Sequence, residues 1–107
     1  MLGFAQQICR IGVCCMGKAR AHIYITGRVQ GVFYRSFVRT KAQLLNLKGW
    51  AKNTMDGCVE IVFEGETEDI NSAIEECRRG PPHAQITDLR VEWEKPRGEF
   101  NEFEIRQ

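Results

Sequence analysis

Apolar and polar residues alternate over residues 21–26, where Ile23 and Ile25 fall on one side of the chain. A period of two predicts a strand with one buried face. An Asp-Gly pair at residues 56–57 marks a tight turn and predicts a hairpin around it. We expect further strands over residues 48–53, 59–64 and 89–93, and a short fifth strand that carries Phe103 and Ile105.

Apolar residues recur at helical spacing in two other segments. The first predicts a helix from about Tyr34 to about Leu47, and the second a helix that has Thr67 as its N-cap and ends before Gly80. Their apolar stripes are Val38, Ala42 and Leu45 in the first, and Ile70, Ala73, Ile74 and Cys77 in the second.

The elements follow one another in the order β-α-β-β-α-β, with the short fifth strand at the end. Two helices from two such halves can cover one face of a single sheet. We therefore expect a ferredoxin-like α/β (α+β) sandwich with a mainly antiparallel sheet. Many activities share this architecture, so the fold by itself assigns no function. The strand residues expected to face the helices are Ile23, Ile25, Val59, Ile61, Phe63, Leu89 and Val91.

The bulk properties exclude some classes of protein. At 107 residues the chain is long enough for one core and too short for two. A net charge of +1 provides no basic surface for nucleic acid, and the first strand places only Tyr24 where a base could stack. No apolar run approaches the length of a membrane span. We expect neither nucleic acid nor membrane as a partner.

The first fifteen residues do not share the pattern of the rest. Residues 1–15 are mildly apolar, lack a basic start and show no sustained helical stripe, whereas Met16 opens a segment that looks like an ordinary N-terminus. We expect translation to begin at Met16, residues 1–15 to form a mobile extension and residues 16–107 to form the domain. The competing interpretation is an extension that packs against the domain.

The cysteines and histidines do not form a recognisable metal-binding pattern. The chain has five cysteines, an odd number without repeated C-x-x-C spacing, and His22 and His83 lie far from the cysteine-rich segment. We therefore expect no metal. The cysteine content weakly favours the reducing cytoplasm.

The segment Gly27–Arg35 stands between the first predicted strand and the first predicted helix. Backbone N–H groups at a helix N-terminus are unpaired and attract anions, and Gly31 permits the turn such a loop needs. Arg35 adds a planar set of donors that can hold two phosphate oxygens. The alternative is a simple turn, with Arg35 facing solvent.

A second polar group ends the second predicted strand. Asn53 carries a donor and an acceptor on one side chain, so it can orient a water molecule without changing protonation state. The alternative is an asparagine that only favours the following turn.

Together the two segments resemble the acylphosphatases, small enzymes that hydrolyse the carboxyl-phosphate bond. Gly27–Arg35 resembles the first signature of this family throughout. The second signature is similar to Gly49–Asn53 followed by Gly57, Val59 and Gly65. The likeness covers about residues 19–107 and leaves residues 1–15 outside.

The resemblance implies a role for each matched residue. Arg35 is expected to bind the phosphate and Asn53 to position the attacking water. No cofactor or metal is implied, and no side chain in either signature is an evident general base, so we expect a phosphate oxygen of the substrate to take the proton. Backbone N–H groups of the loop are expected to complete the cradle, from Gln30, Gly31, Val32, Phe33, Tyr34 and Arg35.

The implied partner is a small acyl phosphate, and we expect a monomer. A second hypothesis is a non-catalytic module that binds acyl or carbamoyl phosphate, like the acylphosphatase-like domains of larger maturation proteins. Nothing follows the domain in this sequence, which favours the enzyme.

Overall fold

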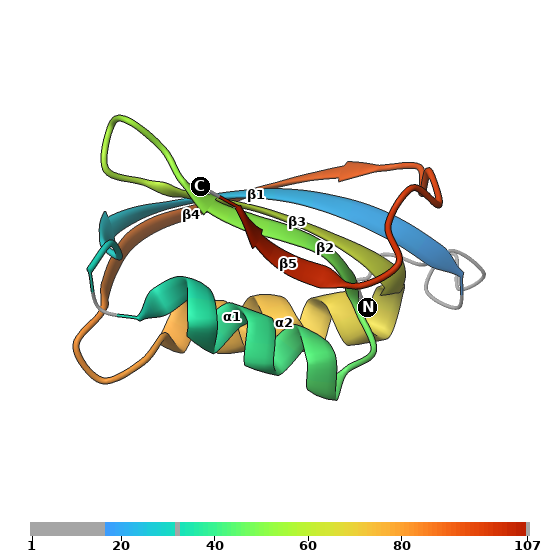
Figure 1. Ribbon diagram of the computed structural model, residues 1–107, viewed down its shortest axis with the longest axis horizontal. Helices are drawn as coiled ribbons and strands as arrows, with labels where there is room; N and C mark the ends of the chain where they lie inside the picture. The colour runs from blue at the N-terminus through green and yellow to red at the C-terminus, as the bar shows by residue number, and fades with distance from the viewer. Residues whose placement is uncertain (1–16, 32, 107) are drawn as a thin grey trace, which may run out of the picture.

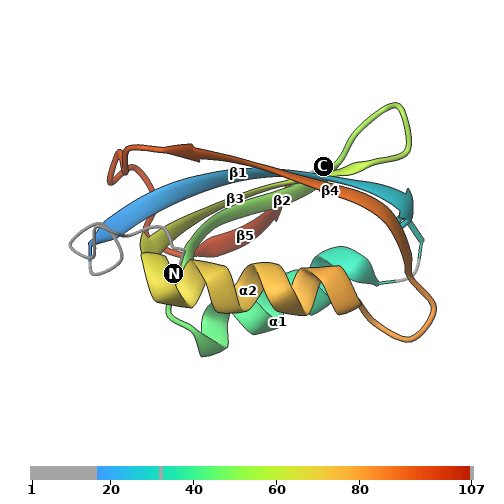
Figure 2. The same ribbon diagram turned by 180° about the vertical axis from the view of Figure 1, so that it is seen from behind.

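The computed structural model describes residues 17–31 and 33–106. Within these ranges, one five-stranded sheet is covered on one face by two helices (Figure 1, Figure 2). No helix in this part of the chain is long and apolar enough to cross a bilayer. The elements in chain order are β1 (Lys18–Arg28), α1 (Tyr34–Leu44), β2 (Lys48–Asn53), β3 (Val59–Glu66), α2 (Thr67–Arg79), β4 (Gln85–Glu94) and β5 (Phe103–Arg106).

The strands lie in the order β4-β1-β3-β2-β5. Every neighbouring pair is antiparallel except β2 and β5, which run parallel. β2 and β3 form the predicted hairpin around the Asp-Gly turn, and β2 has the predicted bounds. The ferredoxin-like sandwich predicted from the element order is confirmed.

The core lies between the sheet and the two helices. α1 packs against β2 and β5, while α2 packs against β1, β3 and β4. The predicted covered face is confirmed, although Leu89 and Val91 on the edge strand β4 are only half-buried. Val62 on the opposite face is also fully buried, because it pairs with Trp50 on one side and His22 on the other.

Two predicted helix boundaries are wrong. α1 ends at Leu44 rather than Leu47, because Asn46 adopts a left-handed conformation (φ 57°) that a helix cannot continue through. Thr67 is the first residue of α2 rather than its N-cap. Its hydroxyl donates to the carbonyl of Gly17 (2.7 Å), which joins the start of α2 to the residue before β1. The predicted extension, residues 1–15, lies outside the described residues.

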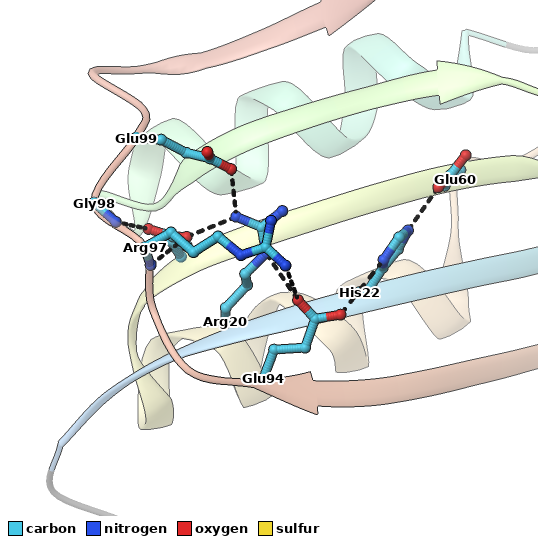
Figure 3. A network of polar contacts seen from close by, with 8 residues as sticks. Arg20, His22, Glu60, Glu94, Arg97, Gly98 and Glu99 are labelled. Atoms are coloured by element: carbon cyan, nitrogen blue, oxygen red, sulfur yellow. Dashed lines mark hydrogen bonds and ion pairs between the residues drawn. The ribbon is translucent and has the colours of Figure 1, made fainter.

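A buried ion-pair network surrounds Arg20 near the start of β1 (Figure 3). Arg20 Nη1 lies 2.9 Å from Glu64 Oε2 and 2.8 Å from Glu99 Oε1, and Arg20 Nε lies 3.1 Å from Glu94 Oε1. Arg20 and Glu64 are 6% and 7% exposed, so both charges are removed from solvent and each depends on its partners.

Glu64 also holds the segment that connects β4 to β5. Its carboxylate accepts hydrogen bonds from the backbone N–H groups of Arg97 (3.0 Å) and Gly98 (3.1 Å). Burial by itself would raise the pKa of the Glu64 carboxyl, but the bonds from Arg97, Arg20 and Gly98 outweigh burial and lower that pKa. The network therefore favours ionised Glu64.

Candidate active site

The loop between β1 and α1 begins at a β-bulge. The register between β1 and β4 shifts at Thr26/Gly27, and a Cβ atom on Gly27 would lie 2.0 Å from the carbonyl oxygen of Gln85. Only glycine allows this approach between the two backbones. The bulge turns the chain out of the sheet at the point where the loop starts.

Gln30 fastens the loop to the β2–β3 hairpin. Its side-chain Nε2 donates to the carbonyl oxygens of Thr54 and Cys58, both at 2.9 Å. From the sequence, only the backbone N–H of Gln30 was expected to contribute to the site. A side-chain tether was not predictable, because it depends on the hairpin folding back beside the loop.

The N-terminus of α1 has no capping side chain. Its N-cap is Phe33, in a left-handed conformation (φ 61°, ψ 26°), and the first turn contains no acidic residue. The first N–H groups of a helix have no partner within it and carry partial positive charge. By contrast, the first turn of α2 carries Glu68 and Asp69. The α1 terminus is therefore the more favourable place for an anionic ligand.

Arg35 is held in place by the last strand. It is half-buried, and its Nη1 donates to the backbone carbonyl of Arg106 in β5 at 3.1 Å. One hydrogen bond leaves most of the guanidinium donors available. The short fifth strand therefore orients this arginine.

A pocket of about 240 Å³ brings Arg35 and Asn53 together. Arg35 reaches it from the first turn of α1, and Asn53 from the end of β2. Of the predicted loop residues, Gly31, Phe33 and Tyr34 also line the pocket, Gln30 does not, and Val32 lies outside the described residues. Three further residues line the pocket that the sequence did not predict there: Val29, Ser36 and Ile105.

Asn53 Oδ1 is buried and has no hydrogen-bond partner within residues 17–31 and 33–106. Buried polar atoms in folded proteins nearly always have a partner, so an unpaired one indicates a ligand or a functional role. Arg20 Nε and Glu94 Oε1 also lack ideal hydrogen bonds, but they form an ion pair with each other at 3.1 Å. The oxygen of Asn53 is the unpaired buried atom that lies at the pocket.

Tyr34 has a structural role and does not act as a general acid. Its side chain is buried, and its hydroxyl donates to the carbonyl of Cys77 in α2 at 2.7 Å. Burial raises the pKa of the Tyr34 phenol well above its ordinary value, so the group stays neutral. Tyr34 thereby fixes the start of α1 against α2.

The described residues contain no group of three or more His, Cys, Asp and Glu side chains that could hold a metal ion. His22 does not line the pocket and lies instead 2.6 Å from Glu60 Oε2 on the sheet face opposite the helices. His83 is likewise absent from the pocket lining. The pocket thus contains a cation, an amide and backbone groups, but no histidine.

An acylphosphatase family model matches residues 21–105, which include the loop, both helices and all of β2. This chain belongs to the acylphosphatase family. The acylphosphatase of Pelotomaculum thermopropionicum is 44% identical over 90 residues, which cover 84% of this chain and 98% of the relative. The crystal structure of acylphosphatase from Bacillus subtilis superposes with a TM-score of 0.81 at 36% identity, covering 83% of this chain and 99% of that one.

A larger protein contains a similar fold. Full-length HypF, in a phosphate- and nucleotide-bound crystal structure, matches with a TM-score of 0.75 at 33% identity. The match covers 86% of this chain but only 12% of HypF. The acylphosphatase fold therefore occurs both as a whole small protein and as a module.

Proposed function

We propose that Arg35, Asn53 and the backbone N–H groups of the loop carry out the hydrolysis of acyl phosphates, the activity of the family to which this chain belongs. The products are a carboxylate and inorganic phosphate. The single observation that carries these assignments is the unpaired, buried Oδ1 of Asn53, which shares a pocket with Arg35.

The phosphate is held by charge and by backbone donors. The Arg35 guanidinium can donate to two phosphate oxygens, and the uncapped N-terminus of α1 supplies N–H groups and partial positive charge. The left-handed Phe33 next to the right-handed first turn gives the alternation in which successive N–H groups point to one side. Transfer of a phosphoryl group needs mainly positioning and charge stabilisation, which these groups provide.

Asn53 positions the nucleophile. Its Oδ1 accepts a hydrogen bond from a water molecule and holds it in line with the bond to be broken. Because an amide does not titrate, this orientation is independent of pH over the ordinary range. The carboxylate of an acyl phosphate is a good leaving group, so the water needs little further activation.

The proton of the water goes to a phosphate oxygen of the substrate. No histidine lines the pocket, and neither Arg35 nor Asn53 is a base at neutral pH. Because the substrate takes the proton, and Arg35 with the loop N–H groups stabilises the charge, the proposed reaction needs no metal. If the rate followed a histidine-like titration and disappeared in His22→Gln or His83→Gln, this assignment would be wrong.

The alternative function is binding of acyl or carbamoyl phosphate without turnover. The occurrence of the same fold as a module of HypF is the observation that favours it. The two functions differ in one measurement: a binding module protects the acyl phosphate or leaves its hydrolysis rate unchanged, whereas the enzyme releases phosphate catalytically.

The test is release of phosphate from benzoyl phosphate with a chelator present, compared between the wild type and Asn53→Ala. We expect the variant to lose about a hundredfold or more in kcat, because the water is no longer held in line. Inorganic phosphate should still inhibit at nearly the wild-type concentration. Asn71→Ala, at an exposed asparagine of α2, is the matched control and should behave as wild type. Wild-type kcat in Asn53→Ala would refute the role of Asn53.

A cytoplasmic monomer is the state we propose for this enzyme. The described residues of one chain supply Arg35, Asn53 and the pocket around them, which is consistent with a monomer. Light scattering coupled to size exclusion tests the oligomeric state.

A further inference from the structure

We propose that Phe33 contacts the acyl group of the substrate and makes the enzyme favour aromatic and large aliphatic acyl phosphates over acetyl phosphate. The inference rests on the proposed function, because it concerns the part of the substrate that the phosphate cradle does not hold. Arg35 and the loop N–H groups recognise phosphate and leave the acyl group unspecified.

The side chain of Phe33 is 84% exposed although it is large and apolar. The described residues include three other exposed large hydrophobic side chains, and none of these lines the pocket that contains Arg35 and Asn53. Phe33 does line it. An exposed aromatic side chain at a pocket of charged and polar groups is an apolar surface for a ligand. The three others are Leu44, Met55 and Trp93.

The backbone of Phe33 makes an aromatic residue costly at this position. Its φ of 61° is in the left-handed region, where a residue with a Cβ atom is less stable than glycine. The exposed ring recovers little of this energy through burial in the folded protein. Such strain at a bulky residue is typical of functional sites, where the side chain contributes to binding rather than to stability.

The pocket has two kinds of wall. Arg35, Asn53 and Ser36 are polar, whereas Val29, Phe33 and Ile105 are apolar. Its volume of about 240 Å³ is below the range of roughly 300–1,000 Å³ that encloses a drug-sized ligand. The phosphate and its attacking water occupy the polar part, so a large acyl group extends beyond the pocket. The exposed ring of Phe33 is the apolar surface that such a group meets.

The expected effect is moderate. Contact between an acyl group and one aromatic ring that stays partly exposed is worth about 0.5–1.5 kcal/mol, a factor of roughly 2 to 12 in kcat/KM. The quantity that isolates it is the ratio of kcat/KM for benzoyl phosphate to that for acetyl phosphate, because both substrates present the same phosphate to the cradle.

The experiment compares this ratio in the wild type, Phe33→Asn and Phe33→Trp. Asparagine tolerates the left-handed backbone and removes the ring, and tryptophan keeps an aromatic surface. We expect Phe33→Asn to lower the ratio about three- to tenfold and Phe33→Trp to keep it within about twofold of wild type. Met55→Ser, which removes another exposed apolar side chain outside the pocket, is the control and should leave the ratio unchanged.

The outcomes separate this inference from the proposed function. If both substrates lose kcat/KM equally in Phe33→Asn, the ring only shapes the loop and the inference is overturned. If the wild type hydrolyses neither substrate, the proposed function itself is wrong, and this result is distinct from a changed ratio of the two kcat/KM values. A lowered ratio in Phe33→Asn that Phe33→Trp does not show supports contact with the acyl group.

Discussion

Polar groups near the start of β1 are paired with one another, whereas polar groups at the pocket beyond its other end are left partly unpaired. Near its start, Arg20 is buried and surrounded by three carboxylates, one of which also accepts two backbone N–H groups. The strand ends eight residues after Arg20, roughly 25 Å away, and the loop that follows leads to the pocket. In the pocket Arg35 is half-exposed and Asn53 Oδ1 is unpaired among the described residues. Figure 1 places the start of β1 and the loop before α1 at opposite ends of the sheet.

This difference indicates that the Arg20 end of the sheet contributes to stability and the pocket end to catalysis. Polar groups that satisfy one another rigidify a fold but have no bonding capacity left for a ligand. Unpaired donors and acceptors, a strained backbone at Phe33 and an uncapped helix cost stability and leave that capacity available. We therefore expect substitutions at the Arg20 end to change unfolding and substitutions at the pocket end to change catalysis.

The largest effect is expected for Arg35→Ala. Among the described residues that line the pocket, Arg35 is the only side-chain cation, so its removal should lower kcat/KM for benzoyl phosphate about a thousandfold or more, because charge on the phosphate is no longer neutralised. The free energy of unfolding should change by less than about 1 kcal/mol, since within residues 17–31 and 33–106 the side chain of Arg35 makes one hydrogen bond, the exposed one to Arg106. Phosphate-release kinetics and urea unfolding measure the two quantities.

Arg39→Ala is the matched control for this prediction. Arg39 is exposed one turn further along α1 and does not line the pocket, so its loss should leave kcat/KM near wild type. A similar loss of activity in both variants would show that general positive charge on α1 matters rather than Arg35.

The second effect is expected in stability. Arg20→Met leaves Glu64 buried without its cation and should lower the free energy of unfolding by about 3 kcal/mol, measured by urea denaturation. kcat should stay near wild type while the variant is folded, because the network is remote from the pocket. Arg28→Met, at an exposed arginine at the other end of β1, should change stability little.

A double variant tests whether the loss in Arg20→Met comes from the uncompensated charge. Arg20→Met with Glu64→Leu should recover part of the stability, since it removes both charges together. If Arg20→Met is as stable as wild type, the network does not stabilise the fold and the contrast between the two ends is wrong.

The third effect is the response of the same network to acid. Burial opposes the shift, but the hydrogen bonds from Arg97, Arg20 and Gly98 hold the pKa of Glu64 below its ordinary value in the folded state, so the unfolded chain binds the proton more readily. The stability that Glu64 contributes is therefore complete above about pH 5 and is lost as the pH falls through the lowered pKa. The loss should be smaller than in Arg20→Met, because the other hydrogen bonds of the network remain.

Urea unfolding of the wild type and Glu64→Gln between about pH 6 and pH 3 isolates this contribution. The difference in stability between the two proteins should shrink toward low pH. A difference that stays constant over the whole range would show that ionisation of Glu64 is not the stabilising factor.

Local patterns predicted most of the fold, because strand and helix periods are properties of neighbouring residues. The hairpin and the bounds of β2 are confirmed for this reason. The end of α1 was not predictable from periodicity, since Leu47 continues an apolar pattern while Asn46 takes a left-handed turn. The Arg20 network was not predictable either, because its members come from positions as far apart as residues 20 and 99.

The candidate site was more predictable than the network because two sequence motifs mark it. The resemblance of these motifs to the two family signatures singled out Arg35 and Asn53, and both residues line one pocket in the structure. The side-chain tether of Gln30 and the exposure of Phe33 depend on how the loop lies against the hairpin and the pocket. No single-sequence pattern carries that information.

The smallest effect concerns the strain at Phe33. Phe33→Gly removes the left-handed penalty of about 1–2 kcal/mol but adds about 0.5–1 kcal/mol of freedom to the unfolded chain. The exposed ring adds little, so the free energy of unfolding should rise by up to about 1 kcal/mol. Leu44→Gly removes another exposed large side chain, at the last residue of α1, and should lower stability by up to about 1 kcal/mol. Opposite signs in the two glycine variants would demonstrate that the pocket end keeps a destabilising residue at the position where we place the acyl group. A stability loss in Phe33→Gly as large as in Leu44→Gly would show instead that the ring supports the loop.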